Sequence, residues 1–179
     1  MTRRGHEGQA DDANNAAFPT DFFYFIRAPN VHAVAYTLVG GYAVGTYSYV
    51  RATTDIDFFY HSTSENIAQL MRAMTLIGAP PALIDAQHLA AADAVTQMGA
   101  PPIRIDLLSS LSGVTFEQEA ADTIRLEIAN EILPVIGLVA LRRNKQATKQ
   151  TKDRNDLRHL PKAPASSSSS SLTLKRRRK

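Results

Sequence analysis

The 179-residue sequence contains no cysteine. Disulfide bonds, a thiolate nucleophile and cysteine-held zinc or iron–sulfur centres are therefore excluded. Long hydrophobic runs are also missing, because no apolar stretch approaches the roughly 18 residues that a membrane-spanning helix needs. The residues up to Ala17 lack the apolar segment of a secretory signal. We therefore expect a cytoplasmic protein with no membrane association.

Acidic residues are absent from the C-terminal end of the chain. Residues 162–179 contain six basic residues: Lys162, Lys175, Arg176, Arg177, Arg178 and Lys179. Without them the formal net charge falls from +3 to −3, so the basic character of the protein belongs mostly to this tail. Such a tail can bind RNA, act as an address signal or remain a non-specific polyelectrolyte, and the sequence leaves these alternatives open.

Two polar ends flank a single predicted domain. Residues 1–17 are rich in Asn, Asp and Gly, and residues 162–179 include a run of six serines, Ser166–Ser171. Neither end can bury enough apolar surface to compensate for ordering, so we expect both to be disordered. The remaining residues, 18–161, are predicted to form one domain, since 44% hydrophobic and 21% charged residues are typical of a soluble globular protein.

Hydrophobic periodicity alternates between helix and strand within residues 18–161. We expect strands over 34–39, 54–60, 103–109, 124–128 and 132–136, with a weaker one over 95–98. Helices are expected over 42–49, from a capping box at Ser62 and Glu65 to Ile77, after Gly137, and from Thr151. These elements predict an α/β (α+β) fold with a mixed, twisted sheet of about five strands flanked by helices.

Gly40 and Gly41 directly follow the first predicted strand. Glycines let the backbone approach a ligand closely, and the start of the following helix would offer free N–H groups to a phosphate. A plain strand-to-helix turn is the alternative, because neither a P-loop nor a dinucleotide-binding glycine pattern is present.

Asp55 and Asp57 alternate with Ile56 and Phe58, so both acids should share one face of a strand. A third carboxylate, Asp106, lies in another predicted strand. Two carboxylates 4 Å apart repel each other by roughly 4 kcal/mol at an effective dielectric constant of 20. Their convergence would therefore require a divalent metal ion, protonation or basic partners, and Mg2+ is the ion that best suits such oxygen ligands and triphosphates.

Several segments together resemble the nucleotidyltransferase superfamily with a polymerase-beta-like palm. The segments are LVGGYAV, RATTDIDFFY, PPIRIDLLSS, PVIGL and NKQATKQTKDRNDLRHL. They are most similar to a small prokaryotic branch related to abortive-infection and toxin–antitoxin nucleotidyltransferases. The resemblance covers about residues 22–160, which is nearly everything outside the two ends.

The resemblance implies an enzyme that moves a nucleoside monophosphate from a nucleoside triphosphate to an acceptor hydroxyl and releases pyrophosphate. Gly40 and Gly41 would contact the triphosphate. Asp55 and Asp57 would hold two Mg2+ ions. Asp106 would complete the shell of the first ion and is the candidate to accept the proton of the acceptor hydroxyl.

Four further residues match motifs of this branch and are predicted to contact the nucleotide: Arg51, Lys145, Lys152 and Asp153. For Arg51 the alternative is a structural ion pair that offsets the acids. For Lys145, Lys152 and Asp153 the alternative is a solvated basic helix.

The acceptor is not identified by the sequence, and RNA, a protein or a small molecule all remain open. The resemblance also implies an antitoxin chain as a partner. Two other functions stay as alternatives. One is a catalytically weak, nucleotide-binding regulatory protein, and the other is an RNA-binding module that uses the basic residues 142–158.

Overall fold

Six strands form one mixed sheet in the computed structural model, which describes residues 20–47, 49, 52–100 and 103–162. The strands are β1 (Tyr36–Val39), β2 (Asp55–Tyr60), β3 (Val95–Ala100), β4 (Ile103–Leu108), β5 (Ile124–Ile128) and β6 (Glu131–Val135). Their order across the sheet is β3-β4-β2-β1-β6-β5. The predicted α/β fold with a mixed sheet is confirmed, and the weak strand near residue 95 makes the sheet six-stranded rather than about five-stranded.

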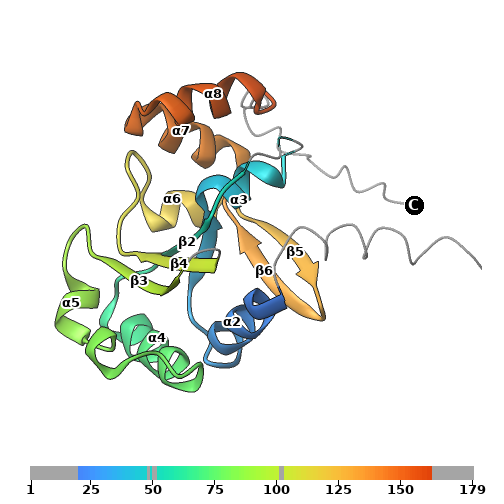
Figure 1. The fold of residues 1–179 in the computed structure, drawn as a ribbon. Coiled ribbons are helices and arrows are strands. Elements are labelled where there is room, and N and C mark those ends of the chain that lie inside the picture. Colours follow the sequence, from blue (N-terminus) through green and yellow to red (C-terminus); the bar gives the residue numbers. More distant parts are fainter. Residues whose placement is uncertain (1–19, 48, 50–51, 101–102, 163–179) are drawn as a thin grey trace, which may run out of the picture.

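Helices lie on both sides of this sheet (Figure 1). They are α2 (Thr20–Val31), α3 (Gly40–Gly45), α4 (Ser64–Leu76), the 3-10 turn Pro81–Leu83, α5 (Ala86–Ala90), α6 (Phe116–Ala120), α7 (Leu138–Thr148) and α8 (Thr151–His159). Figure 1 shows α3, α6, α7 and α8 gathered at one end of the molecule, with α2, α4 and α5 towards the other.

The centre of the sheet combines parallel and antiparallel pairs. Strand β2 runs antiparallel to β1 and parallel to β4, while β1 also pairs in parallel with β6. In this register Asp57 lies opposite Val39 on one side and opposite Asp106 on the other. The two strands that carry the acids are therefore direct neighbours.

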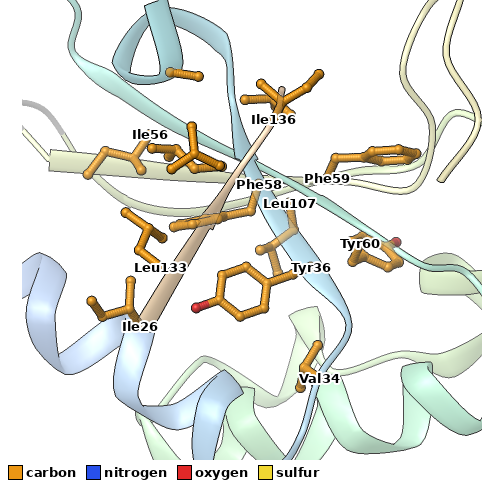
Figure 2. Packing of buried hydrophobic residues seen from close by; sticks show 14 of the residues in the cluster. Ile26, Val34, Tyr36, Ile56, Phe58, Phe59, Tyr60, Leu107, Leu133 and Ile136 are labelled. Atoms are coloured by element: carbon orange, nitrogen blue, oxygen red, sulfur yellow. The ribbon is translucent and has the colours of Figure 1, made fainter. Parts of the chain in front are cut away.

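The hydrophobic core lies between the sheet and α2 with α4, around Phe58. The ring of Phe58 stacks on Phe25 at 4.9 Å and on Phe22 at 5.9 Å, both from α2, and meets Tyr36 edge-on at 5.4 Å. Figure 2 shows Phe58 with Ile26 and Leu133 in this layer. Because Ile56, Phe58 and Tyr60 are all buried here, Asp55 and Asp57 must point to the opposite face.

Two predicted helix boundaries are wrong. Helix α4 is capped by Thr63, whose hydroxyl accepts a hydrogen bond from the Asn66 N–H, so the predicted capping box of Ser62 and Glu65 does not form. Asn66 is also buried and its side chain bonds the backbone of Ala35 and His61, which fixes where α4 begins. Helix α3 starts at the first glycine and ends at residue 45, instead of spanning residues 42–49.

Some predictions lie outside the described residues. These are the proposed disorder of residues 1–17 and of residues 163–179, and the position of Arg51. In the part of the chain that is described, no helix has the length and apolar character needed to cross a membrane.

Candidate active site

Three carboxylates gather on one face of two neighbouring interior strands, β2 and β4. Asp57 and Asp106 are directly opposite each other in the parallel pair of β2 and β4. Asp55 lies two residues before Asp57 and therefore points to the same face. The structure thus brings together the three acids that the sequence singled out.

Arg104 lies between two of these acids, and sequence reasoning did not identify it. Its Nη2 is 2.8 Å from Asp55 Oδ2 and 3.1 Å from Asp106 Oδ2, and its Nε is 2.9 Å from Asp106 Oδ1. Gln97 of β3 also donates to Asp106, at 3.3 Å. The signal was present in the sequence, because Arg104 and Asp106 are two residues apart on one strand and must share a face.

Asp57 is the acid whose ionisation is most disturbed. Burial, followed by the charges of Asp106 and Asp55, raises the pKa of Asp57 to about 6, although Lys152 and Lys145 act in the opposite direction. The two lysines come from α8 and α7. Their influence on this pKa shows that the helix pair lies within electrostatic reach of the acids.

Gly40 lies directly against Asp57. Its backbone has φ +66°, a conformation that favours glycine, and a Cβ at this position would collide with the Asp57 carboxylate. Gly41 follows as a buried residue of α3. The turn that the sequence predicted as a phosphate cradle is therefore packed against the acids.

Lys145, Asp153 and Asp156 form a buried ion cluster that joins α7 to α8. The Lys145 Nζ is 2.7 Å from Asp153 Oδ1 and 3.0 Å from Asp156 Oδ2, and all three residues are at most 4% exposed. Thr148 also donates to Asp153, at 2.6 Å. Burial alone would raise the pKa of Asp153, but the bonds from Lys145 and Thr148 outweigh it and hold the pKa below its ordinary value.

The predicted nucleotide contacts therefore occupy different environments. Lys152 is exposed on α8, whereas Lys145 and Asp153 are turned inward and bind each other. Gly40 and Gly41 lie beside the acids, and Arg51 is outside the described residues. Contact of any of these residues with a nucleotide stays a prediction.

The contacts that the three acids make in this structure indicate whether they could hold Mg2+. Within the described residues, no group of three or more acidic or histidine side chains is arranged to hold a metal ion. The reason is visible in the geometry, because Asp55 and Asp106 both bind the guanidinium of Arg104. A cation already lies among hard oxygen donors, so the donor set fits Mg2+ provided that Arg104 moves aside.

No protein-family model and no curated protein matches the sequence. Among solved structures, TM1012 from Thermotoga maritima, described as a candidate nucleotidyltransferase, matches with a TM-score of 0.51 and 9% identity over 77% of this chain and 88% of that chain. The solution structure of the antibiotic-resistance factor ANT(2'')-Ia matches with a TM-score of 0.46 and 12% identity over 83% and 82%. The likeness to TM1012 shows that the two chains share a fold.

Replacing Gly40 with alanine should destabilise the protein. The Gly40→Ala variant must relieve both an unfavourable φ and the collision with Asp57, and we expect a loss of roughly 1–3 kcal/mol in the free energy of unfolding, measured with urea. Gly45→Ala is the matched control, because a Cβ there meets nothing within 4 Å and helical alanine is favoured over glycine. Equal stability of the two variants would contradict the packing of Gly40 on Asp57.

The raised pKa of Asp57 predicts a pH-dependent stability difference between the wild type and Asp57→Asn. The folded pKa of about 6 lies above the ordinary aspartate pKa of 3.8, so the folded state binds the proton more tightly and loses stability as pH rises through this window. Without divalent metal, Asp57→Asn should be more stable than the wild type by about 1–3 kcal/mol at pH 7.5 and nearly equal at pH 4. Urea unfolding over this range measures the difference, and a constant difference would contradict the raised pKa.

Proposed function

We propose that the chain is a magnesium-dependent nucleotidyltransferase that moves a nucleoside monophosphate from a nucleoside triphosphate to an acceptor hydroxyl. One observation carries the proposal. Asp55, Asp57 and Asp106 converge on the adjacent strands β2 and β4, next to the positive-φ turn at Gly40, in a chain that shares the fold of TM1012.

In the proposed reaction the acceptor oxygen forms a bond to the α-phosphorus, and the bond from that phosphorus to the oxygen leading to the β-phosphate breaks. Pyrophosphate leaves with the electron pair. Asp55, Asp57 and Asp106 would hold Mg2+, which when bound neutralises charge on the phosphates. Asp106 is the proposed acceptor of the hydroxyl proton, because it lies on the strand beside Asp57.

The turn at Gly40 and Gly41 would let the backbone approach the triphosphate. Lys152 is exposed on α8 and is the proposed cationic contact to the phosphates, with Arg51 as a second one. Lys145 and Asp153 enter the proposal differently, since their buried pairing can position α8, and with it Lys152, relative to the acids.

The acceptor and the biological setting rest on weaker support. A toxin–antitoxin role, with an antitoxin chain as partner, follows from the sequence resemblance alone. The acceptor hydroxyl is proposed to belong to RNA, a protein or a small molecule, and the activity test has to separate these classes.

Label transfer tests the proposed reaction. The full chain is incubated with each α-32P-labelled nucleoside triphosphate, Mg2+ and, in parallel, total RNA, protein extract or a small-molecule fraction. We expect label in one acceptor class and release of pyrophosphate. Asp57→Asn should lower the rate by at least about a hundredfold, because it weakens charge neutralisation at the reacting phosphate.

Chelation of Mg2+ should abolish transfer by the wild type. The exposed Glu127→Gln, on strand β5 and thus across the sheet from β4, is the matched control for loss of a carboxylate and should keep full activity. Equal transfer by the wild type and by Asp57→Asn would refute the assignment of the acids.

A second candidate function, nucleic-acid binding, is favoured by the charge distribution of α7 and α8. Residues 138–160 have two acids, Asp153 and Asp156, and both are buried against Lys145. The exposed charged side chains in this segment are all basic: Arg143, Lys149, Lys152, Arg154 and Arg158. The solvent surface of the helix pair is therefore uniformly positive, as expected for contact with a polyanion.

A stacked pair of rings lies on the same helix pair. The rings of Tyr49 and His159 are 4.1 Å apart with an interplanar angle of 6°, and Asn155 donates to the Tyr49 hydroxyl at 2.6 Å. Positive charge beside aromatic rings is the combination that binds single-stranded nucleic acid without sequence preference.

Fluorescence anisotropy with a labelled single-stranded RNA tests this candidate. We expect affinity to fall steeply with salt, and the double variant Arg154→Glu/Arg158→Glu to lose on the order of tenfold in affinity and to have a shallower salt slope. Arg72→Glu, an exposed residue on α4 near the other end of the molecule in Figure 1, is the matched control and should bind as the wild type does. Affinity that does not respond to salt would contradict the candidate.

A further inference from the structure

Arg104 is built into the acid cluster by the register of the sheet. It is the residue of β4 that lies opposite Asp55, two positions before Asp106. Its side chain is 31% exposed, and those of Asp55 and Asp106 are 33% and 9% exposed. The guanidinium is therefore held at a partly buried site rather than free in solvent.

The contacts of Arg104 satisfy both neighbouring acids at once. Two nitrogens bind the two carboxylate oxygens of Asp106, and Nη2 also binds Asp55 Oδ2 at 2.8 Å. A planar guanidinium can form such a bridge, whereas a lysine ammonium is a point charge that cannot reproduce the paired geometry. These are the oxygens that the proposed function assigns to magnesium.

We propose that Arg104 is an internal counter-cation that competes with the metal ion for Asp55 and Asp106. The inference rests on the proposed function and adds a residue that regulates access of the metal ion to the acids. With Arg104 in place, the acids are neutralised and closed to metal. When the guanidinium swings away from Asp55 and releases Asp106, the carboxylates become available to the ion.

Competition between Arg104 and the metal ion predicts in which direction the metal affinity changes when Arg104 is replaced. A metal ion that enters the wild-type site must first displace the charge-assisted hydrogen bonds from Arg104 to Asp55 and Asp106. Removing the guanidinium removes this competitor. The affinity for a divalent ion should therefore rise by on the order of tenfold when Arg104 is replaced by methionine.

Binding of Mn2+ to the full chain without nucleotide tests the proposal, with titration calorimetry as the readout. Four proteins are compared: the wild type, Arg104→Met, Arg104→Lys and Arg125→Met. Arg125 is an exposed arginine on β5 and is the matched control. We expect Arg104→Met to bind Mn2+ about tenfold more tightly and Arg125→Met to bind as the wild type does.

Arg104→Lys separates bridging from simple charge. It keeps the positive charge and loses the bidentate bridge, so the proposal expects Mn2+ affinity clearly above that of the wild type. Equal Mn2+ affinity of Arg104→Lys and the wild type would mean that the bridge of the guanidinium to both acids is not what keeps the ion out, and would overturn the proposal. Unchanged or weaker binding by Arg104→Met would overturn it as well.

Thermal melting provides a second readout. Without metal, Arg104→Met should melt at a lower temperature than the wild type, because the acids then repel each other unscreened, and Mn2+ should restore more stability to the variant than to the wild type. If the methionine variant does not fold, the lysine variant decides by the comparison already stated.

The outcomes also separate this proposal from the proposed function. Nucleotidyl transfer by the wild type, together with equal Mn2+ affinity of the wild type and the Arg104 variants, would overturn the role of Arg104 and leave the reaction intact. Absence of Mn2+ binding in all four proteins would overturn the role of Arg104, and the proposed reaction would be overturned only if nucleotidyl transfer were absent as well.

Discussion

The mutual repulsion of three carboxylates is the constraint that shapes this structure. Asp55, Asp57 and Asp106 are brought together by the pairing of β2 with β4, and their charges must be balanced. The balance is partial, because Arg104 neutralises Asp55 and Asp106 while Asp57 is left with a pKa of about 6. Negative charge is therefore not fully balanced on the side where Asp57 faces Gly40.

The helix pair α7–α8 shows how folding separates charges that are mixed in the sequence. Lys145 forms buried ion pairs with Asp153 and Asp156. The negative charges of this segment are therefore neutralised in the interior, and the exposed charges are positive. The same buried cluster fixes α8 on α7, and its lysine lowers the pKa of Asp57. A cluster that stabilises the helix pair therefore also contributes to the field at the acids.

The sequence predicted the shared face of Asp55 and Asp57 because strand alternation depends on local pattern alone. It placed Asp106 correctly through its strand, and it named a basic partner as one of three ways to balance the acids, without identifying Arg104. The partner depends on the parallel register of β2 and β4, which is a tertiary property. The burial of Lys145 was likewise hidden, because a basic helix looks solvated until its neighbour supplies buried acids.

The acids lie on β2 and β4, which are both interior strands of the sheet, with β3 covering the outer side of β4. Insertions or deletions in the hairpin between β5 and β6, or around the short helix α5, would leave the β2–β4 register untouched. The spacing of the three acids is therefore insulated from changes of length at the margins of the sheet.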